Sequence, residues 1–264
     1  MADANPFEID GFVNETMPEQ VQLMRQEIPA WFALAEDTNR TMMRIQRAAK
    51  DAVRTNSMDP QAIAVRLLIR ACYSLQGVIV MTERGMVAEA RMLVRSIAED
   101  AIYLAALVSN PDDFIAKLKE DSDAARARQG KFLLAEKLVQ EGQREKLMEA
   151  VEGIGKVKNF NVRDLAGKGP LTGMYLTYLR LSDDAGHMSA KSIDRHIHRN
   201  DDGTWLYKVG PGTAEDNAAT LYHAVMAAIA VGVGITDLIE ATRAGSNFRE
   251  LADRVAAMPA VPTV

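Results

Sequence analysis

One stretch of the sequence, residues 175–198, contains the residue types that acid–base chemistry requires. It holds three of the four histidines of the chain, and six residues separate Arg180 from His187. A histidine titrates near neutral pH and can act as a general acid or base. An arginine can stabilise the charge of a phosphorane-like transition state. The pair therefore predicts catalytic residues for metal-independent RNA cleavage. In the competing interpretation, His187 hydrogen-bonds backbone at a helix end.

A second group of candidates lies on the helix that we expect over residues 86–110. Arg91, Arg95 and Glu99 are spaced four apart, so they form one ridge along that helix. The ridge borders apolar positions, and a desolvated charge needs a partner. Either Arg95 and Glu99 pair at the edge of the core, or the arginines bind an anionic group or orient a residue of another helix. Asp100 falls on the opposite face, where we expect it to be solvated.

The polar residues of a later helix, expected over residues 171–184, complete the predicted site. Tyr178 and Ser182 are four apart and share one face of this helix, and Gly186 predicts that the helix ends before His187. We expect this helix to be a neighbour of the helix over residues 86–110, because charged residues border the apolar stripe of the latter. The polar cluster that we predict comprises Arg91, Arg95, Glu99, Tyr178, Ser182 and His187.

The remaining histidines and the single cysteine favour structural interpretations. His196 and His198 would point about 200° apart on a helix, and His223 and Cys72 lie within apolar runs. Zinc-ligand spacing, a phosphate loop and a dinucleotide fingerprint are all absent from the sequence. We therefore expect no metal and no cofactor.

The pattern of apolar residues is helical almost throughout the chain. It predicts an all-α fold, a bundle of about eight helices that forms one domain over residues 1–264. Prolines and polar caps mark the helix starts, as at Asp59-Pro60 and Thr213. We expect a loose arm over residues 1–17, a glycine-rich loop over 151–170 and a frayed tail over 259–264.

A small β-hairpin is predicted near residues 199–208. Asp202-Gly203 is a turn signal, and Trp205, Leu206 and Tyr207 follow it. A short helix, capped by Ser189, is expected just before it over residues 190–198.

Composition restricts the function classes. The 264 residues carry a formal net charge of -5, with 48% hydrophobic and 25% charged residues. An acidic chain without a basic stripe is not expected to have a large nucleic-acid footprint. The two most apolar segments, 62–81 and 224–236, contain charges or are too short to span a membrane, so we expect core helices and no membrane association. The N-terminus lacks signal-peptide character, which makes the cytoplasm the expected location.

The ridge and the later polar segment together resemble a bacterial family of helical proteins of unknown function. The resemblance covers roughly residues 62–198 and implies a helical fold with a polar cluster. The motif consists of Arg91-x-x-x-Arg95-Ser96-x-x-Glu99, Tyr103-Leu104, Tyr178-x-x-Leu181-Ser182 and His187.

Arg180 and His187 also fit the Arg-x(4–6)-His pattern of the HEPN superfamily. That resemblance implies a helical bundle, often dimeric, and frequently a ribonuclease of a toxin–antitoxin or phage-defence system. In that case Arg180 and His187 would be the catalytic pair.

Two functional hypotheses follow. The first is a protein with a binding or structural role, in which the polar cluster is buried or holds a small anionic ligand. A homodimer is an expected assembly of such a bundle. The alternative is a HEPN-like ribonuclease, and RNA is an expected partner only in that case. Burial of the cluster with saturated hydrogen bonds would favour the first hypothesis.

Overall fold

Prolines and capping side chains set where the long helices begin in the computed structural model, which describes residues 6–53, 55–155, 160–239 and 242–261. A carboxylate oxygen of Asp59 accepts a hydrogen bond from the Gln61 amide at 2.9 Å, and Pro60 is the first residue of α4. The hydroxyl of Thr213 caps α11 in the same way, through the Asp216 amide at 3.1 Å. Both predicted helix starts are confirmed.

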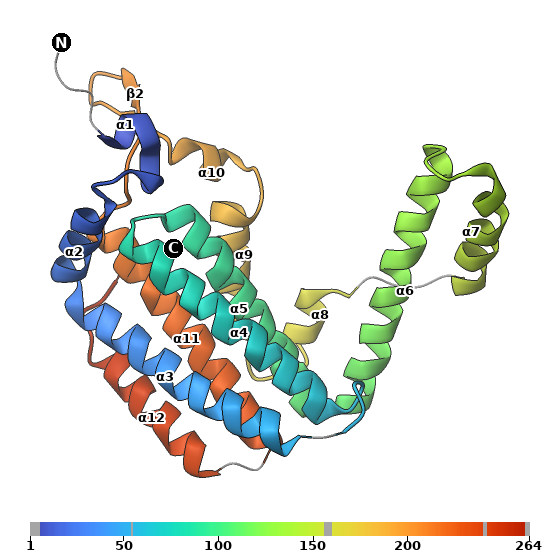
Figure 1. Cartoon of the computed structure of the whole chain (residues 1–264). Helices are drawn as coiled ribbons and strands as arrows, with labels where there is room; N and C mark the ends of the chain where they lie inside the picture. The colour runs from blue at the N-terminus through green and yellow to red at the C-terminus, as the bar shows by residue number, and fades with distance from the viewer. Residues whose placement is uncertain (1–5, 54, 156–159, 240–241, 262–264) are drawn as a thin grey trace.

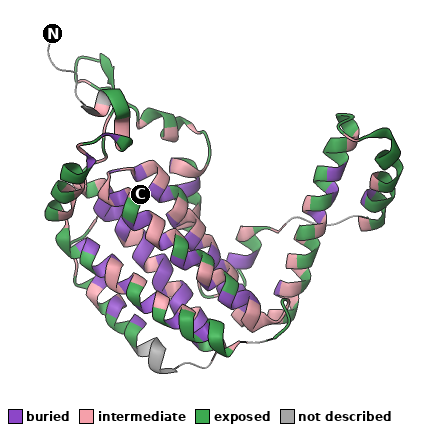
Figure 2. Ribbon diagram, in the orientation of Figure 1, coloured by how far each residue is buried: buried purple, intermediate pink, exposed green. Residues whose placement is uncertain are grey.

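Five long helices lie side by side and enclose the core (Figure 1). α5 is central, because it packs against α4, α9 and α11. Buried residues therefore occur on several faces of α5, and Figure 2 shows burial concentrated where these helices meet. The five helices are α3 (Pro29–Ala52), α4 (Pro60–Glu83), α5 (Val87–Ser109), α11 (Ala214–Leu238) and α12 (Thr242–Ala256).

Two helices form an arm that projects away from the bundle (Figure 1). α6 (Pro111–Ala135) leaves the end of α5, α7 (Glu141–Ile154) packs back along it, and α8 (Val162–Ala166) lies against α5. The arm is mostly exposed (Figure 2), as its dense charge predicts. The predicted loop over 151–170 is wrong in part, because it contains the end of α7 and the whole of α8; residues 156–159 lie outside the described residues.

The elements that carry the candidate site follow α8. The π-helical turn η2 continues α9 and ends before His187, as Gly186 predicts. The strands pair antiparallel, with Ile197 opposite Tyr207 and Arg199 opposite Trp205. The elements are α9 (Thr172–Leu181), η2 (Ser182–Gly186), α10 (Ala190–Asp194), β1 (Ile197–Arg199) and β2 (Trp205–Tyr207).

The hairpin is present where the sequence predicts it, but it begins earlier. The helix expected over 190–198 ends at Asp194, and residues 197–199 form β1 instead. The turn explains the difference, because Gly203 adopts a positive φ of 83° and brings β2 back alongside these residues. The Lys208 amide then donates to the His196 carbonyl at 2.8 Å and extends the pairing.

The N-terminal residues are more ordered than a loose arm. They form α1 (Pro6–Asp10), the 3₁₀ turn η1 (Gly11–Val13) and the start of α2 (Met17–Glu27). The Phe7 and Phe12 rings pack edge to face, with centroids 4.9 Å apart. Residues 1–5 lie outside the described residues, as do 262–264 of the predicted tail. These additional short helices, and the break between α2 and α3 before Pro29, make the expected number of about eight helices too low.

α4 and α11 are long and apolar enough to cross a membrane by length and composition alone. In the fold, 50% of the most apolar window of α4 and 67% of that of α11 are buried. Core helices of a bundle have this same pattern, so the two helices are weak evidence for a membrane span.

Candidate functional site

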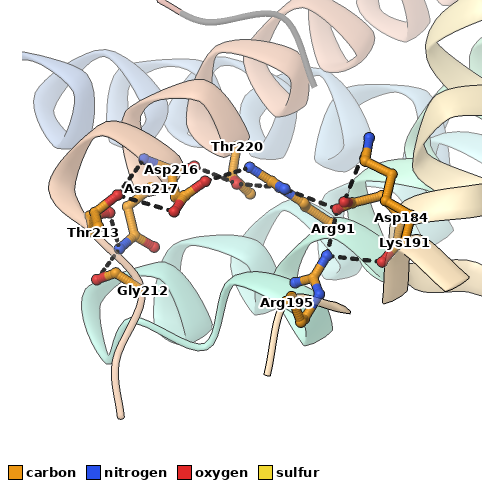
Figure 3. A network of polar contacts seen from close by, with 9 residues as sticks. All are labelled: Arg91, Asp184, Lys191, Arg195, Gly212, Thr213, Asp216, Asn217 and Thr220. Carbon is orange, nitrogen blue, oxygen red and sulfur yellow. Dashed lines mark hydrogen bonds and ion pairs between the residues drawn. The ribbon is translucent and has the colours of Figure 1, made fainter. Parts of the chain in front are cut away.

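Arg91 is a buried arginine whose charged nitrogens all find partners. Its side chain projects from α5 toward η2 and the start of α11 (Figure 3). Nη1 donates to Asp184 at 2.8 Å, Nη2 to Asp216 at 3.1 Å and Nε to the Thr220 hydroxyl at 3.2 Å. Only 7% of the residue is exposed, so these bonds replace water that the guanidinium has lost. Arg91 therefore ties η2 and α11 to α5.

Asp184 is a residue of the π-helical turn η2. Its carboxylate accepts hydrogen bonds from two arginines, Arg91 and Arg195. Arg195 Nη2 donates to the Asp184 carboxylate at 2.6 Å and to its carbonyl at 2.8 Å, and Lys191 Nζ lies 3.7 Å from the other carboxylate oxygen (Figure 3). Burial alone would raise the pKa of Asp184, but the hydrogen bonds and charges of Arg91 and Arg195 outweigh it and lower that pKa. The ionised form of Asp184 is therefore favoured, and it holds both arginines.

Arg95 lies one turn along α5 and connects to α9. Its Nε donates to the Ser182 hydroxyl at 2.8 Å and its Nη2 to the Tyr178 hydroxyl at 2.6 Å. The guanidinium also lies over the Tyr178 ring, 4.5 Å from the centroid. A side chain at Gly186 would place a Cβ 3.0 Å from Arg95 Cδ, so a small residue suits that position. The predicted convergence of Arg95, Tyr178 and Ser182 is confirmed.

Glu99 does not join this group. It forms an ion pair with Arg70 of α4, Nη2 to Oε2 at 3.0 Å, so the expected Arg95–Glu99 pair is wrong. The expectation failed because Arg70 reaches Glu99 from the neighbouring helix. Arg95 donates its hydrogen bonds to Tyr178 and Ser182 instead.

Asp100 is fully buried, which contradicts the solvated position expected for it. Arg70 Nη1 lies 3.2 Å from one carboxylate oxygen, but neither oxygen has a hydrogen bond among the described residues. Burial raises the pKa of Asp100 to about 7; the Arg70 charge lowers it and the Glu99 charge raises it further. The face opposite the arginine ridge is also a core face, because α5 is the central helix of the bundle.

Arg180 and His187 are both exposed. Within the described part of the chain, neither side chain has a hydrogen bond or ion pair, and no contact joins the two. The backbone amide of His187 donates to the Ser182 carbonyl at 3.1 Å. The structure does not bring His187 into contact with Arg95 or Glu99, so this residue leaves the predicted cluster.

The other histidines are divided between surface and core. His196 and His198 are exposed on and beside the hairpin, and the described residues contain no group of three His, Cys, Asp or Glu side chains that could hold a metal ion. His223 is half-buried, and its Nε2 has no partner among the described residues. Burial, followed by the charges of Arg91 and Arg180, lowers the pKa of His223 to about 4. The expected satisfied core histidine is thus unsatisfied at one nitrogen.

A cleft of about 360 Å³ opens above the Arg91–Asp184 pair. Most of its lining comes from the start of α5, the α10 region and the segment that follows β2, and Phe12, Asp184 and Asp216 complete it. Lys208 has no side-chain partner among the described residues, and Lys191 has only its distant contact with Asp184. The charged residues that line the cleft are Glu89, Arg91, Asp184, Lys191, Arg195, Lys208 and Asp216.

Sequence reasoning missed three members of this site: Asp184, Arg195 and Asp216. Asp216 lies three residues after the Thr213 cap, and a carboxylate in the first turn of a helix is available to a neighbouring cation. Asp184 lies two residues after Ser182, and the π-helical turn redirects it. For Arg195 the sequence offered no signal, because its position depends on the fold of α10 and the hairpin.

Comparison with known proteins places most of these residues within one recognised region. A family of unknown function (DUF5677) matches residues 61–204, which is more than half of the chain. The matched region contains Arg91, Arg95, Asp184 and Arg195, whereas Asp216 lies outside it. Neither the curated proteins nor the solved structures provide a match. The chain belongs to the family of unknown function DUF5677.

Proposed function

We propose that this protein binds a small carboxylate- or phosphate-bearing ligand in the cleft beside Arg91. The observation that supports this is the pattern of pairing. The carboxylates of Asp184 and Asp216 are occupied by arginines beneath the cleft. Among the described residues, the ammonium group of Lys208 has no partner and that of Lys191 only a distant one. Glu89 is the remaining acidic residue of the lining. An anion would be attracted to the two lysines.

The dimensions of the cleft suit a small molecule. About 360 Å³ lies near the lower end of the range for small-molecule sites. Lysine ammonium groups act as point charges, so they bind carboxylates and phosphates without a strict angular requirement.

The residues beneath the cleft favour binding over catalysis. Arg91 uses all three of its guanidinium nitrogens, and Arg95 uses two, in hydrogen bonds within the protein. These hydrogen bonds hold both guanidinium groups against protein partners, so the arginines serve the network. In this proposal the buried network positions the lysine-bearing segments, and the lysines contact the ligand.

Isothermal titration calorimetry with inorganic phosphate and with malonate tests the proposal. We expect binding by the wild type that Lys191→Gln/Lys208→Gln weakens by at least about tenfold, or 1.4 kcal/mol. The control is Lys119→Gln/Lys146→Gln on the arm, which changes the net charge equally at two exposed lysines. Undetectable binding of both probes, or equal weakening by the two double variants, would contradict the proposal.

A HEPN-like ribonuclease remains the alternative, and one observation favours it. Arg180 and His187 are exposed, unpaired among the described residues and separated by the π-helical turn η2. Such turns occur frequently at functional sites. Two free side chains on either side of an irregular turn would be accessible to a phosphodiester, most readily across the interface of a homodimer.

The alternative is tested by incubating total RNA with wild type, Arg180→Ala and His187→Ala without added metal. Because both side chains are exposed, both variants should keep the wild-type melting temperature. Cleavage by wild type that both substitutions abolish would establish the ribonuclease, and sedimentation of the wild type would report whether it is a dimer. An absence of cleavage by folded wild type would reject this alternative and leave the binding proposal standing.

A further inference from the structure

A second cleft is lined by residues of α3 and α12. These two helices run side by side at the edge of the bundle (Figure 1). Its volume is about 670 Å³, in the middle of the range for small-molecule sites. The lining residues come from α3 and α12, outside the region that the family match covers. The cleft at Arg91 and this one share no lining residue.

Positive charge exceeds negative charge in this second cleft. Four arginines line it against two carboxylates, on a chain whose formal net charge is -5. The charged lining residues are Asp37, Arg40, Arg44, Arg47, Glu250 and Arg254.

Two of the four arginines are held by one carboxylate. Asp37 accepts from Arg40 at 2.6 Å and from Arg254 at 2.8 Å, so it bridges α3 and α12. The hydrogen bond from Arg40, followed by that from Arg254, lowers the pKa of Asp37. Asp37 therefore stays ionised and keeps both guanidinium groups at one end of the cleft.

The other two arginines have no acidic partner among the described residues. Arg44 donates only to the neutral hydroxyl of Thr41, at 3.1 Å, and Arg47 has no side-chain contact of this kind. With Arg40 they follow one another at spacings of four and three, so all three lie on one ridge of α3. Neighbouring like charges on a helix are destabilising, and a bound anion would remove that repulsion.

The lining also offers contacts for an organic group. Met43 and Leu251 contribute apolar surface between the charged residues. The carbonyl oxygen of the Asn39 side chain accepts from Gln76 at 3.2 Å, which leaves its amide hydrogens available. The arginine ridge is short, because the seven steps from Arg40 to Arg47 span only about 10 Å of helix. It can therefore meet one phosphate group and is too short to follow a duplex.

We propose that this cleft binds a small organic phosphate monoester. Arg44 and Arg47 donate to the phosphate, for which a guanidinium is suited by its paired, planar donors. The organic part rests on Met43 and Leu251. This site is independent of the cleft beside Arg91, and either can fail without the other.

Calorimetric titration of the full-length protein with AMP, adenosine and inorganic phosphate tests this site. We expect AMP to bind more tightly than inorganic phosphate and adenosine to show no measurable binding. Arg44→Gln/Arg47→Gln should weaken AMP by at least about tenfold, which equals 1.4 kcal/mol. Both residues are exposed, so the variant should fold and melt like the wild type.

A control variant fixes the location. Arg144→Gln/Arg163→Gln removes two exposed arginines elsewhere and should leave AMP binding unchanged. The proposal is overturned if wild type fails to bind AMP at millimolar concentration, or if Arg44→Gln/Arg47→Gln binds it as tightly as wild type. Inorganic phosphate that binds as tightly as AMP would overturn the part played by Met43 and Leu251.

Discussion

Asp184 and Asp100 are two buried carboxylates of the same helical bundle. Their pKa values depart from the ordinary aspartate value in opposite directions. Asp184 accepts hydrogen bonds from Arg91 and Arg195, and its pKa is lowered despite burial. Asp100 has one arginine at 3.2 Å without a hydrogen bond, and its pKa is raised to about 7. Glu99, the residue before Asp100, adds a repulsive charge. Burial is common to both, so the number and geometry of cationic donors decide which form is stable.

The difference assigns separate roles to two positions along α5. Near its start, Arg91 belongs to an ionic network that holds the Asp184 carboxylate in its ionised form. In its middle, Asp100 is a carboxyl group with a raised pKa and no hydrogen-bonding partner among the described residues.

The largest effect is expected from Arg91→Ala. This change leaves Asp184 with one hydrogen-bonding arginine and removes one hydrogen bond each from Thr220 and Asp216. Removing one member of a buried pair typically costs 3–5 kcal/mol, so we expect a loss of about that size. Urea denaturation at neutral pH measures it. A loss below about 1 kcal/mol would show that the network is a surface-like arrangement and would undo the comparison with Asp100.

The second prediction concerns the pH dependence of stability. The folded-state pKa of Asp100, about 7, exceeds its ordinary value of 3.8. Its contribution to stability is therefore fully present below about pH 4 and is lost as the pH rises to 7. His223 has the opposite slope, because its folded-state pKa of about 4 lies below 6.5. Its contribution is present above pH 6.5 and is lost as the pH falls to 4.

Because these windows overlap, the two slopes should largely cancel in the wild type between pH 4 and 6.5. In Asp100→Asn only the His223 slope remains, so stability should fall as the pH is lowered. In His223→Gln only the Asp100 slope remains, so stability should rise as the pH is lowered. At pH 8 Asp100→Asn should also be more stable than wild type, by up to the order of 4 kcal/mol that the difference in pKa implies. Urea denaturation from pH 4 to 8 measures all three proteins. Identical pH profiles of wild type and Asp100→Asn would contradict a raised pKa of Asp100.

These two regions also mark how far the sequence could predict the molecule. Local rules of capping, proline placement and helical spacing predict two parts of the structure. These are the helix starts at Pro60 and Thr213 and the contact of Arg95 with Tyr178 and Ser182. Those rules act within one helix or between two ridges. They could therefore be applied before the packing of the bundle was known.

Asp100 could not be placed in this way. A helical periodicity separates two faces of a helix but does not say whether a second layer covers the polar one. α5 packs against α4, α9 and α11, so both faces are covered. Asp184 and Arg195 were missed for a different reason: their approach depends on the π-helical turn and on the hairpin, which no period of the sequence encodes.

A smaller effect is expected from Tyr178→Phe, which keeps the ring beneath Arg95 and removes the hydroxyl that accepts its Nη2 hydrogen bond. Hydrogen bonds to charged groups contribute about 1.5–3 kcal/mol, and partial exposure places this one near the lower value. Tyr175→Phe is the control, because Tyr175 stacks on Tyr178 and has no hydroxyl partner among the described residues. Equal losses in the two variants, measured by urea denaturation, would show that Arg95 gains nothing from the hydroxyl.

Asp37 provides the smallest expected effect and the clearest control for burial. Like Asp184 it accepts from two arginines, at 2.6 and 2.8 Å, but its side chain is 36% exposed where that of Asp184 is 5% exposed. Exposed ion pairs contribute about 0–1 kcal/mol and weaken with salt, because water and ions already stabilise the separated charges. Asp37→Asn should therefore cost less than about 1 kcal/mol at low salt and almost nothing at high salt, whereas Asp184→Asn should cost more and respond little to salt. Urea denaturation of both variants at two salt concentrations measures the difference. Equal losses of unfolding free energy in the two variants would mean that the number of arginine partners alone controls stability. The burial of Asp184 would then not explain its contrast with Asp100.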